Sequence, residues 1–154
     1  MGGFVDGIVL HQILQLHNML SARRPPDSVV NIEANMVWDG LFHAFTWVMV
    51  ALGILLLFRA GRRADVPWSG RVLLGSMLAG WGLFNLVEGV VNHHILQVHH
   101  VVERLGLSVW DWVFLGSGAL LVGVGWLMIR SAPLPPVPPP SPPAGRAGRA
   151  GFDA

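Results

Sequence analysis

The chain has 154 residues, of which 53% are hydrophobic and 12% are charged, against about 25% charged residues in an average soluble domain. A domain this small is mostly surface, so its apolar composition favours a lipid bilayer as its solvent. The absence of cysteine excludes disulfide frameworks, zinc fingers, thiol nucleophiles and covalent c-type haem. A net charge of +1 without a basic stripe argues against nucleic acid as a partner.

Four long apolar stretches predict membrane helices, because roughly 20 residues cross a bilayer as a helix. They are residues 2–20, 37–58, 72–102 and 109–129. The links between them are short, so consecutive helices should be antiparallel. The predicted fold is therefore all-α, a four-helix transmembrane bundle over residues 1–130. Residues 131–154 are rich in proline, then in glycine, alanine and arginine, which predicts a disordered tail.

Arginine positions predict the orientation of these helices in a bacterial inner membrane. Most arginines lie around the second link or in the C-terminal region: Arg59, Arg62, Arg63, Arg71, Arg130, Arg146 and Arg149. By the positive-inside rule, the second link and the C-terminus face the cytoplasm. All seven histidines then lie in the outer half of the bundle, where we expect a functional site.

Two segments that lie 82 positions apart are similar in sequence without gaps. DGIVLHQILQLH, residues 6–17, aligns with EGVVNHHILQVH, residues 88–99, so that Asp6 pairs with Glu88. The helices that follow begin alike, with Trp-Asp at residues 38–39 and 110–111. This similarity predicts an internal duplication, with two tandem helical hairpins in parallel orientation.

The polar residues of the third stretch do not share one face of an ideal α-helix. At about 100° per residue, Glu88 and His99 fall on one stripe, and His93 lies about 120 to 140° round from it. We therefore expect some of these groups to face a second cleft or the outer surface.

Glycines recur along the third and fourth stretches and predict close contacts between helices rather than a phosphate-binding loop. They are Gly75, Gly80, Gly82, Gly116, Gly118, Gly123 and Gly125. No Walker, Rossmann or HExxH pattern occurs in the sequence.

Ionisable side chains are costly in hydrocarbon, so the acids and histidines should face the bundle interior and have partners there. Imidazole suits copper, zinc and iron, and a ligating histidine usually donates its other ring N–H to a carboxylate. We predict three histidines of similar depth as ligands of a transition metal (copper, zinc or iron): His17, His43 and His99. Four acids are predicted as orienting or midplane partners: Asp39, Asp111, Asp6 and Glu88.

Other uses of these residues remain open. Haem b could be held by His11 and His93 as an axial pair, because they occupy matching positions in the two similar segments. The run HHILQVHH is similar to histidine motifs of membrane di-iron oxygenases but lacks their repeated set. The alternative function is therefore a small haem- or iron-dependent membrane oxidoreductase, and a ligand-free network of polar contacts is a third reading. The reading that we prefer is metal binding without catalysis.

Three segments, DGIVLHQILQLHNML, WDGLFHAFTWV and GLFNLVEGVVNHHILQVHH, resemble the bacterial predicted membrane proteins called domain of unknown function 2243. The resemblance covers residues 3–129. Some members of that family are associated with, or fused to, the assembly factor of caa3-type cytochrome oxidase. By analogy, the resemblance implies metal or haem handling, with respiratory oxidase assembly proteins as partners.

The similar segments also bear on where the chain begins. The offset that places Asp6 on Glu88 places Met1 on Leu83, well inside the third stretch. If the two acids share one depth, the first helix reaches about 9 Å further inward, short of the roughly 15 Å to the membrane boundary. We therefore expect the natural chain to begin about 10 to 25 residues upstream.

Overall fold

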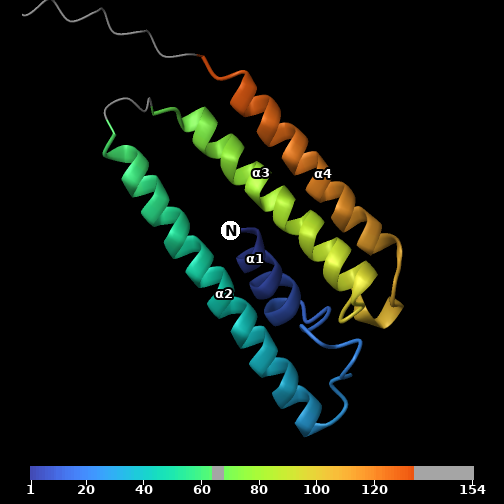
Figure 1. Ribbon diagram of the computed structural model, residues 1–154. Coiled ribbons are helices and arrows are strands. Elements are labelled where there is room, and N and C mark those ends of the chain that lie inside the picture. The colour runs from blue at the N-terminus through green and yellow to red at the C-terminus, as the bar shows by residue number, and fades with distance from the viewer. Residues whose placement is uncertain (64–67, 134–154) are drawn as a thin grey trace, which may run out of the picture.

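The computed structural model describes residues 1–63 and 68–133, and every regular element in them is helical (Figure 1). The predicted all-α fold is confirmed, whereas the predicted tail falls almost wholly outside the described residues. The elements η1 and η2 are π-helices, and η3 is a short 3-10 helix. In chain order the elements are α1 (Gly2–Val5), η1 (Asp6–Ile13), α2 (Val29–Gly61), α3 (Gly70–Glu88), η2 (Gly89–Ile95), η3 (Glu103–Leu105) and α4 (Val109–Arg130).

The helix α2 begins at Val29, well before the predicted start at residue 37. Ser28 caps it, because its side-chain oxygen accepts a hydrogen bond from the backbone N–H of Asn31 at 3.4 Å. The first turns of α2 contain polar residues, so a hydropathy criterion missed them. One of these, the buried Asn35, donates to the carbonyl of Arg24 at 2.8 Å and ties the helix to the loop before it.

Three helices of the described residues are long and apolar enough to cross a bilayer, where the sequence predicted four. They are α2, α3 continued by η2, and α4. The first segment, α1 with η1, covers Gly2–Ile13 and is not among them. The predicted ends at residues 20 and 102 are both too late, because each helix passes into a π-helix and then into a loop.

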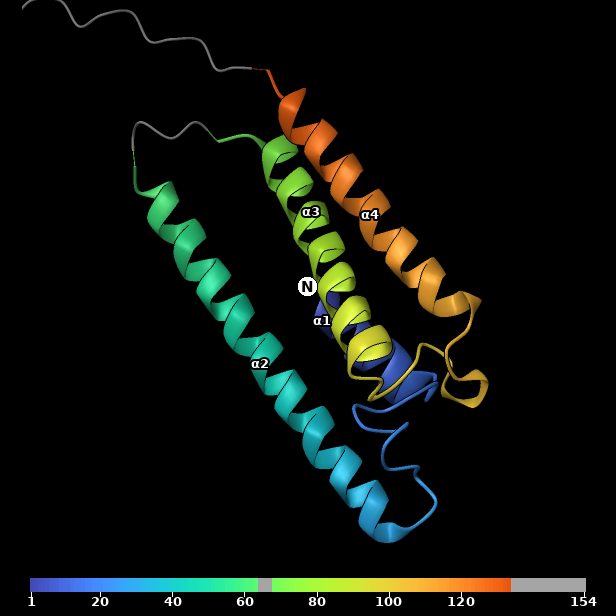
Figure 2. The ribbon, with the colours of Figure 1, turned by 45° about the vertical axis from the view of Figure 1, so that its right-hand side comes forward.

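The helices α3 and α4 lie side by side, and the short first segment lies between α2 and α3 (Figures 1 and 2). The helix α2 packs mainly against α1 and η1, and it meets α3 where the ring centroids of Phe42 and Phe84 lie 6.1 Å apart. The C-terminal ends of α2 and α4 and the N-terminal end of α3 lie at one end of the molecule. The loops at residues 14–28 and 96–108 lie toward the other end, as expected for antiparallel neighbours.

Glycines set the close approach of α3 and α4. A Cβ atom added to Gly82 would lie 2.4 Å from the carbonyl oxygen of Gly118, and one added to Gly125 would lie 2.4 Å from that of Gly75. Backbones this close leave no room for a side chain between them. Three other glycines predicted to mark contacts face open space instead: Gly80, Gly116 and Gly123.

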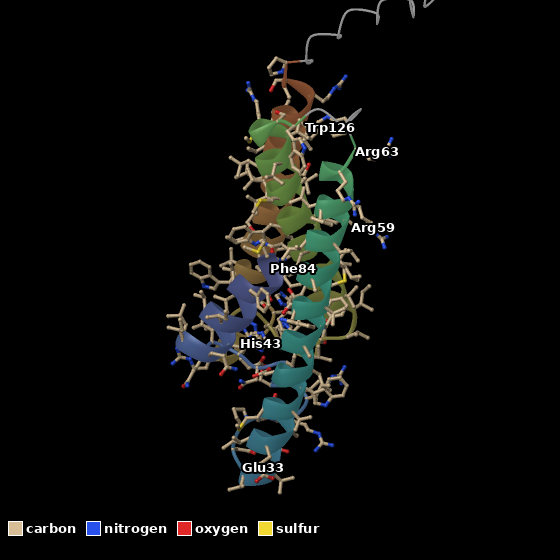
Figure 3. The ribbon with its side chains drawn as sticks, turned by 90° about the vertical axis from the view of Figure 1, so that its left-hand side faces the viewer. Glu33, His43, Arg59, Arg63, Phe84 and Trp126 are labelled. Carbon is tan, nitrogen blue, oxygen red and sulfur yellow. The ribbon has the colours of Figure 1, made fainter. Side chains whose placement is uncertain are left out.

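The interior of the described part is polar, and its surface is apolar. Phe42 is its one buried large hydrophobic side chain, whereas many leucine, valine and tryptophan side chains are exposed. Nitrogen and oxygen atoms gather between the helices near His43, in the half of the molecule toward Glu33 (Figure 3). An outer face of this kind suits contact with lipid tails. The most deeply buried large side chains are all polar: His11, His93, His99, Asn35, Asp39 and Asp111.

Replacing Gly82 with alanine should destabilise the α3–α4 pair, because the new Cβ would overlap the carbonyl of Gly118. We expect the free energy of unfolding to fall by about 1–3 kcal/mol, as is typical of overpacking. Gly123→Ala, whose Cβ meets open space, is the matched control. Titration with SDS in mixed micelles, followed by circular dichroism, measures both variants, and equal stabilities would contradict this packing.

The orientation predicted from the arginines can be tested with reporter fusions. A reporter that is active only in the periplasm should be active after Asp27 or Gly106 and silent after Arg63 or Ser131, since the two pairs of positions flank opposite ends of the helices. A reporter that works only in the cytoplasm, fused at the same sites, is the control. The reverse pattern would overturn the orientation and place the histidines on the inner side.

Candidate metal centre

Each of the two similar segments contains a π-helix, and this geometry aligns an acid with a histidine. In a π-helix, backbone N–H groups bond to carbonyls five residues earlier, so residues five apart lie on nearly the same face. Asp6 and His11 have this spacing in η1, and Glu88 and His93 have it across the start of η2. An ideal α-helix separates such residues by about 140°. The predicted separation of His93 from Glu88 is therefore wrong, because the helix is locally wider than assumed.

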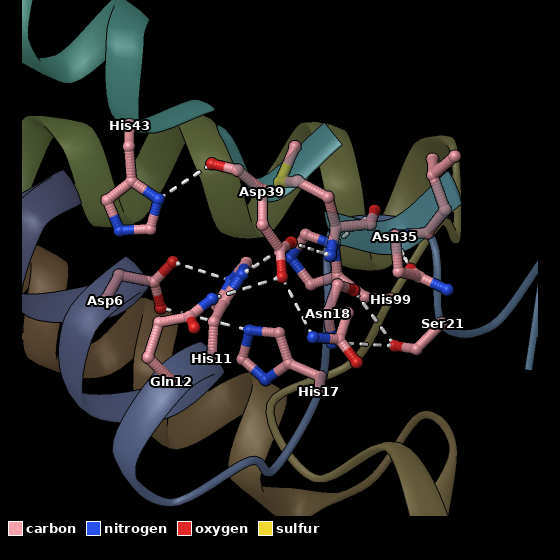
Figure 4. A network of polar contacts seen from close by, with 12 residues as sticks. Asp6, His11, Gln12, His17, Asn18, Ser21, Asn35, Asp39, His43 and His99 are labelled. Carbon is pink, nitrogen blue, oxygen red and sulfur yellow. Dashed lines mark hydrogen bonds and ion pairs between the residues drawn. The ribbon is translucent and has the colours of Figure 1, made fainter. Parts of the chain in front are cut away.

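His11 lies between two carboxylates that come from different helices. Its Nε2 is 3.3 Å from an oxygen of Asp6, and its Nδ1 is 3.1 Å from Oδ1 of Asp39 on α2 (Figure 4). Asp39 also accepts hydrogen bonds from the backbone N–H of Met19 at 2.8 Å and from the amide of Asn18 at 2.9 Å. Asp39 thus fixes both the imidazole and the loop that follows η1.

His93 has the same arrangement in the second segment. Its Nε2 is 3.3 Å from Oε1 of Glu88, and its Nδ1 is 3.0 Å from Oδ1 of Asp111 on α4. Asp111 also accepts a hydrogen bond from the backbone N–H of Val101 at 3.1 Å, and it caps the start of α4. Segments that match at an offset of 82 residues therefore make matching contacts.

The loop after each π-helix carries a second histidine toward the other segment. The glutamine two positions before each of these histidines has a positive φ, 49° in the first loop and 47° in the second. Nδ1 of His17 donates to the carbonyl of Val101 at 3.1 Å, and Nδ1 of His99 donates to the carbonyl of Met19 at 3.1 Å. A neutral imidazole that donates from Nδ1 keeps an acceptor lone pair at Nε2, where a metal can bind, and Nε2 of His17 has no hydrogen-bond partner. Nε2 of His99 lies 2.7 Å from Oε1 of Glu88, so a metal at this ring would replace the proton between the two atoms.

The four imidazole rings meet in one cluster. His17 and His99 stack with ring centroids 4.7 Å apart, and the centroid distance from His11 to His17 is 4.4 Å. In each of two groups of buried residues, the ligand atoms lie within 4.8 Å of one another. One group is His11, His17 and His99, and the other is Glu88, His93 and His99. We refer to the four rings and the two acids at their Nε2 side as the histidine cage: Asp6, His11, His17, Glu88, His93 and His99.

Four buried acids belong to the cage or border it. Every ion pair made by the four buried acids, among the described residues, is to a histidine. Buried carboxylates require compensation, either by protonated imidazoles or by a bound cation. Nε2 of His11 and His17 and Oε2 of Glu88 are also buried without a hydrogen-bond partner. The acids concerned are Asp6, Asp39, Glu88 and Asp111.

His43, which the sequence predicts as a ligand, lies outside both groups of converging ligand atoms. Its Nδ1 donates to the carbonyl of Asp39 in its own helix at 2.7 Å, and its ring packs against Gly7 of η1 (Figure 4). Asp39, the predicted orienting acid, directs its side chain to His11 instead. The structure therefore places His11 where the sequence predicted His43.

The structure brings the predicted ligands His17 and His99 together, and it adds His11 and His93 to them. The sequence signal for the added pair is the similarity of the two segments, which keeps both histidines. His43 lacks this signal, because Leu115 occupies its position in the second half.

The packing of the rings does not favour the haem alternative. Between the predicted axial pair lies His17, whose ring centroid is 4.4 Å from that of His11 and 6.4 Å from that of His93. His99 is similarly close, at 5.8 Å and 5.0 Å. Imidazoles thus fill the space that a macrocycle would need between its two axial ligands.

Comparison with known proteins matches this architecture to one family. The family described as "Predicted membrane protein (DUF2243)" matches residues 1–132, which include both π-helical segments and all three candidate membrane helices. No curated protein and no solved structure matches the chain. Because the match covers most of its length, the chain belongs to the DUF2243 family of predicted membrane proteins.

Proposed function

We propose that this membrane protein binds a transition-metal ion in the histidine cage. The observation that carries the proposal is the convergence of three buried imidazoles, those of His11, His17 and His99. Each of them gives its Nδ1 to an oxygen outside the cage, at 3.1 Å in all three cases. Histidines that ligate metals commonly donate their other ring N–H in this way, which fixes the ring and raises its basicity.

Charge and further ligands support the same proposal. A divalent cation would neutralise carboxylates that have no arginine partner among the described ion pairs. Glu88 and His93 would complete the coordination from the second segment, because their group of converging ligand atoms shares His99 with the first group. The donor set consists of nitrogen and oxygen, without thiolate, and such sets suit zinc, iron or copper(II).

The place of the site in the cell is part of the proposal. The arginine distribution supports a bacterial inner membrane with the C-terminus in the cytoplasm, so the cage would face outward. The resemblance stated above supports respiratory oxidase assembly proteins as partners, with the protein holding or passing a metal rather than catalysing a reaction.

Changing His11, His17 or His99 singly to alanine should weaken metal binding by at least about 10-fold, because each change removes one imidazole ligand. Elemental analysis of the protein purified from its native membrane identifies the metal, and competition with a chelator measures its affinity. His43→Ala and His94→Ala are the controls, because neither residue belongs to a group of converging ligand atoms.

The pattern of losses separates the candidate sites. Weaker metal binding in His43→Ala, with unchanged binding in His11→Ala, would support the ligand set predicted from the sequence. Small and equal effects in all five variants would leave a ligand-free polar network. A Soret band in the visible spectrum of the purified protein would favour haem.

Asp39→Asn should weaken metal binding by about 10-fold, because the amide no longer holds the Nδ1–H of His11 as a carboxylate does. The Met19 N–H and Nδ1 of His11 share Oδ1 of Asp39, so an amide oxygen at that position keeps both contacts without the negative charge, whereas the amide nitrogen replaces the Oδ2 acceptor of Asn18. Asp27→Asn, at an exposed position, is the matched control. In a His11→Ala background, Asp39→Asn should weaken metal binding no further. If it still weakens binding about 10-fold there, Asp39 does not act through His11.

A further inference from the structure

The two similar segments supply matching sets of ligands to the histidine cage. Each set consists of one acid and two histidines, and no member of either set is more than 6% exposed. Donors of this kind, two imidazoles with one carboxylate, hold zinc and non-haem iron in other proteins. We call them the first ligand set (Asp6, His11 and His17) and the second ligand set (Glu88, His93 and His99).

The second ligand set converges on one point. Its three ligand atoms lie within 4.8 Å of one another. Oε1 of Glu88 is 3.3 Å from Nε2 of His93 and 2.7 Å from Nε2 of His99. The acid therefore lies beside the Nε2 atoms of both histidines of its own segment.

The first ligand set has the same order of contacts around Asp6. Oδ2 of Asp6 is 3.3 Å from Nε2 of His11, and Oδ1 is 4.0 Å from Nε2 of His17 (Figure 4). His11 and His17 also converge with His99 of the second set, so the two sets adjoin. Each segment can thus offer an ion its own carboxylate and its own two imidazoles.

One ion does not account for the whole cage. Ligands that bind a single ion at about 2.0–2.2 Å all lie within about 4.4 Å of one another. The described part of the chain instead contains two groups of converging ligand atoms, and His99 is the one residue common to them. This arrangement indicates two neighbouring positions for an ion.

The charge of the cage points in the same direction. Four buried carboxylates lie in the cage or border it, and their ion pairs among the described residues are to histidines. One divalent ion offsets two of these negative charges, whereas two divalent ions offset all four. The imidazoles can then stay neutral, as metal ligation requires.

We propose that the histidine cage is a dinuclear centre, which holds one divalent first-row metal ion in each ligand set. Helical bundles hold pairs of metal ions through inward histidines and carboxylates in this way. The two ions would be neighbours, because the rings of His17 and His99, one from each set, stack with their centroids 4.7 Å apart. This inference rests on the proposed metal binding and adds to it the number of ions and the ligands of each.

The number of ions is measured on protein without a histidine tag, in lipid nanodiscs. The protein is stripped with a chelator, loaded with excess Zn²⁺, passed through a desalting column, and analysed for its zinc and protein content. Empty nanodiscs are the blank. We expect about two zinc ions per chain, one for each ligand set.

Removing the acid of one set should remove one ion. Asp6→Asn weakens the first ligand set and Glu88→Gln the second, so each variant should retain about one zinc ion per chain, and the double variant almost none. Asp27→Asn and Glu33→Gln, which make the same chemical changes at exposed positions, are the matched controls. Circular dichroism checks that every variant keeps its helices.

The unchanged protein loaded with Cu²⁺ provides a test that does not depend on the folding of variants. Two Cu²⁺ ions that are neighbours couple their electron spins, and the pair gives a half-field signal in the electron paramagnetic resonance spectrum. Isolated Cu²⁺ ions give no such signal. We expect the signal at full loading and its loss in Asp6→Asn and in Glu88→Gln.

The outcomes separate this inference from the proposed function. One zinc ion per chain, lost equally in both acid variants, would support a single shared site and overturn the dinuclear centre. Two zinc ions that neither variant removes, without a half-field signal for Cu²⁺, would be adventitious and would overturn it as well. A protein that retains no zinc would contradict the proposed function itself.

Discussion

The placement of ionisable groups inside a membrane protein is the constraint on which the rest of this structure depends. Carboxylates and imidazoles cannot face hydrocarbon without a large cost, so they must face one another. The described part of the chain accordingly has a polar interior with Phe42 as its one buried large hydrophobic side chain. A core of apolar side chains, which organises a soluble domain, is replaced in the α3–α4 pair by close backbone contact at glycines.

The same acids also accept hydrogen bonds from the backbone of the two loops that follow the π-helices. Irregular backbone at membrane depth is tolerated where it lines a polar interior and finds partners there. Asp39 accepts the N–H of Met19 at 2.8 Å, and Asp111 accepts that of Val101 at 3.1 Å. The carbonyls of Met19 and Val101 accept from histidines of the opposite segment. Loop and cage therefore depend on each other, and a change in either acid reaches both.

The two halves differ where their sequences differ, and each difference has a local cause. Glu88 has one more methylene than Asp6, and its Oε1 lies 2.7 Å from Nε2 of His99. Oδ1 of Asp6 is 4.0 Å from Nε2 of His17, the equivalent histidine of the first segment. In the second half α3 and α4 pack tightly through glycines, while α2 packs mainly against α1 and η1. A hollow of about 610 Å³ lies between α2 and α3, and Glu88 is one of the residues that line it. The asymmetry thus leaves a cavity between the two halves, next to the histidine cage.

Hydropathy, arginine positions and the two similar segments determined that this is an all-α membrane protein with its histidines at one end, because these properties depend on composition and order alone. They also indicated His17 and His99 as members of one site. Only the tertiary structure decided which other residues join them. An ideal α-helix placed His93 away from Glu88, and the wider π-helix brings the two together. His43 donates to a carbonyl of its own helix, and His11 joins the converging ligand atoms instead. Helix type and loop path depend on backbone partners far along the chain, and no periodicity in the sequence records them.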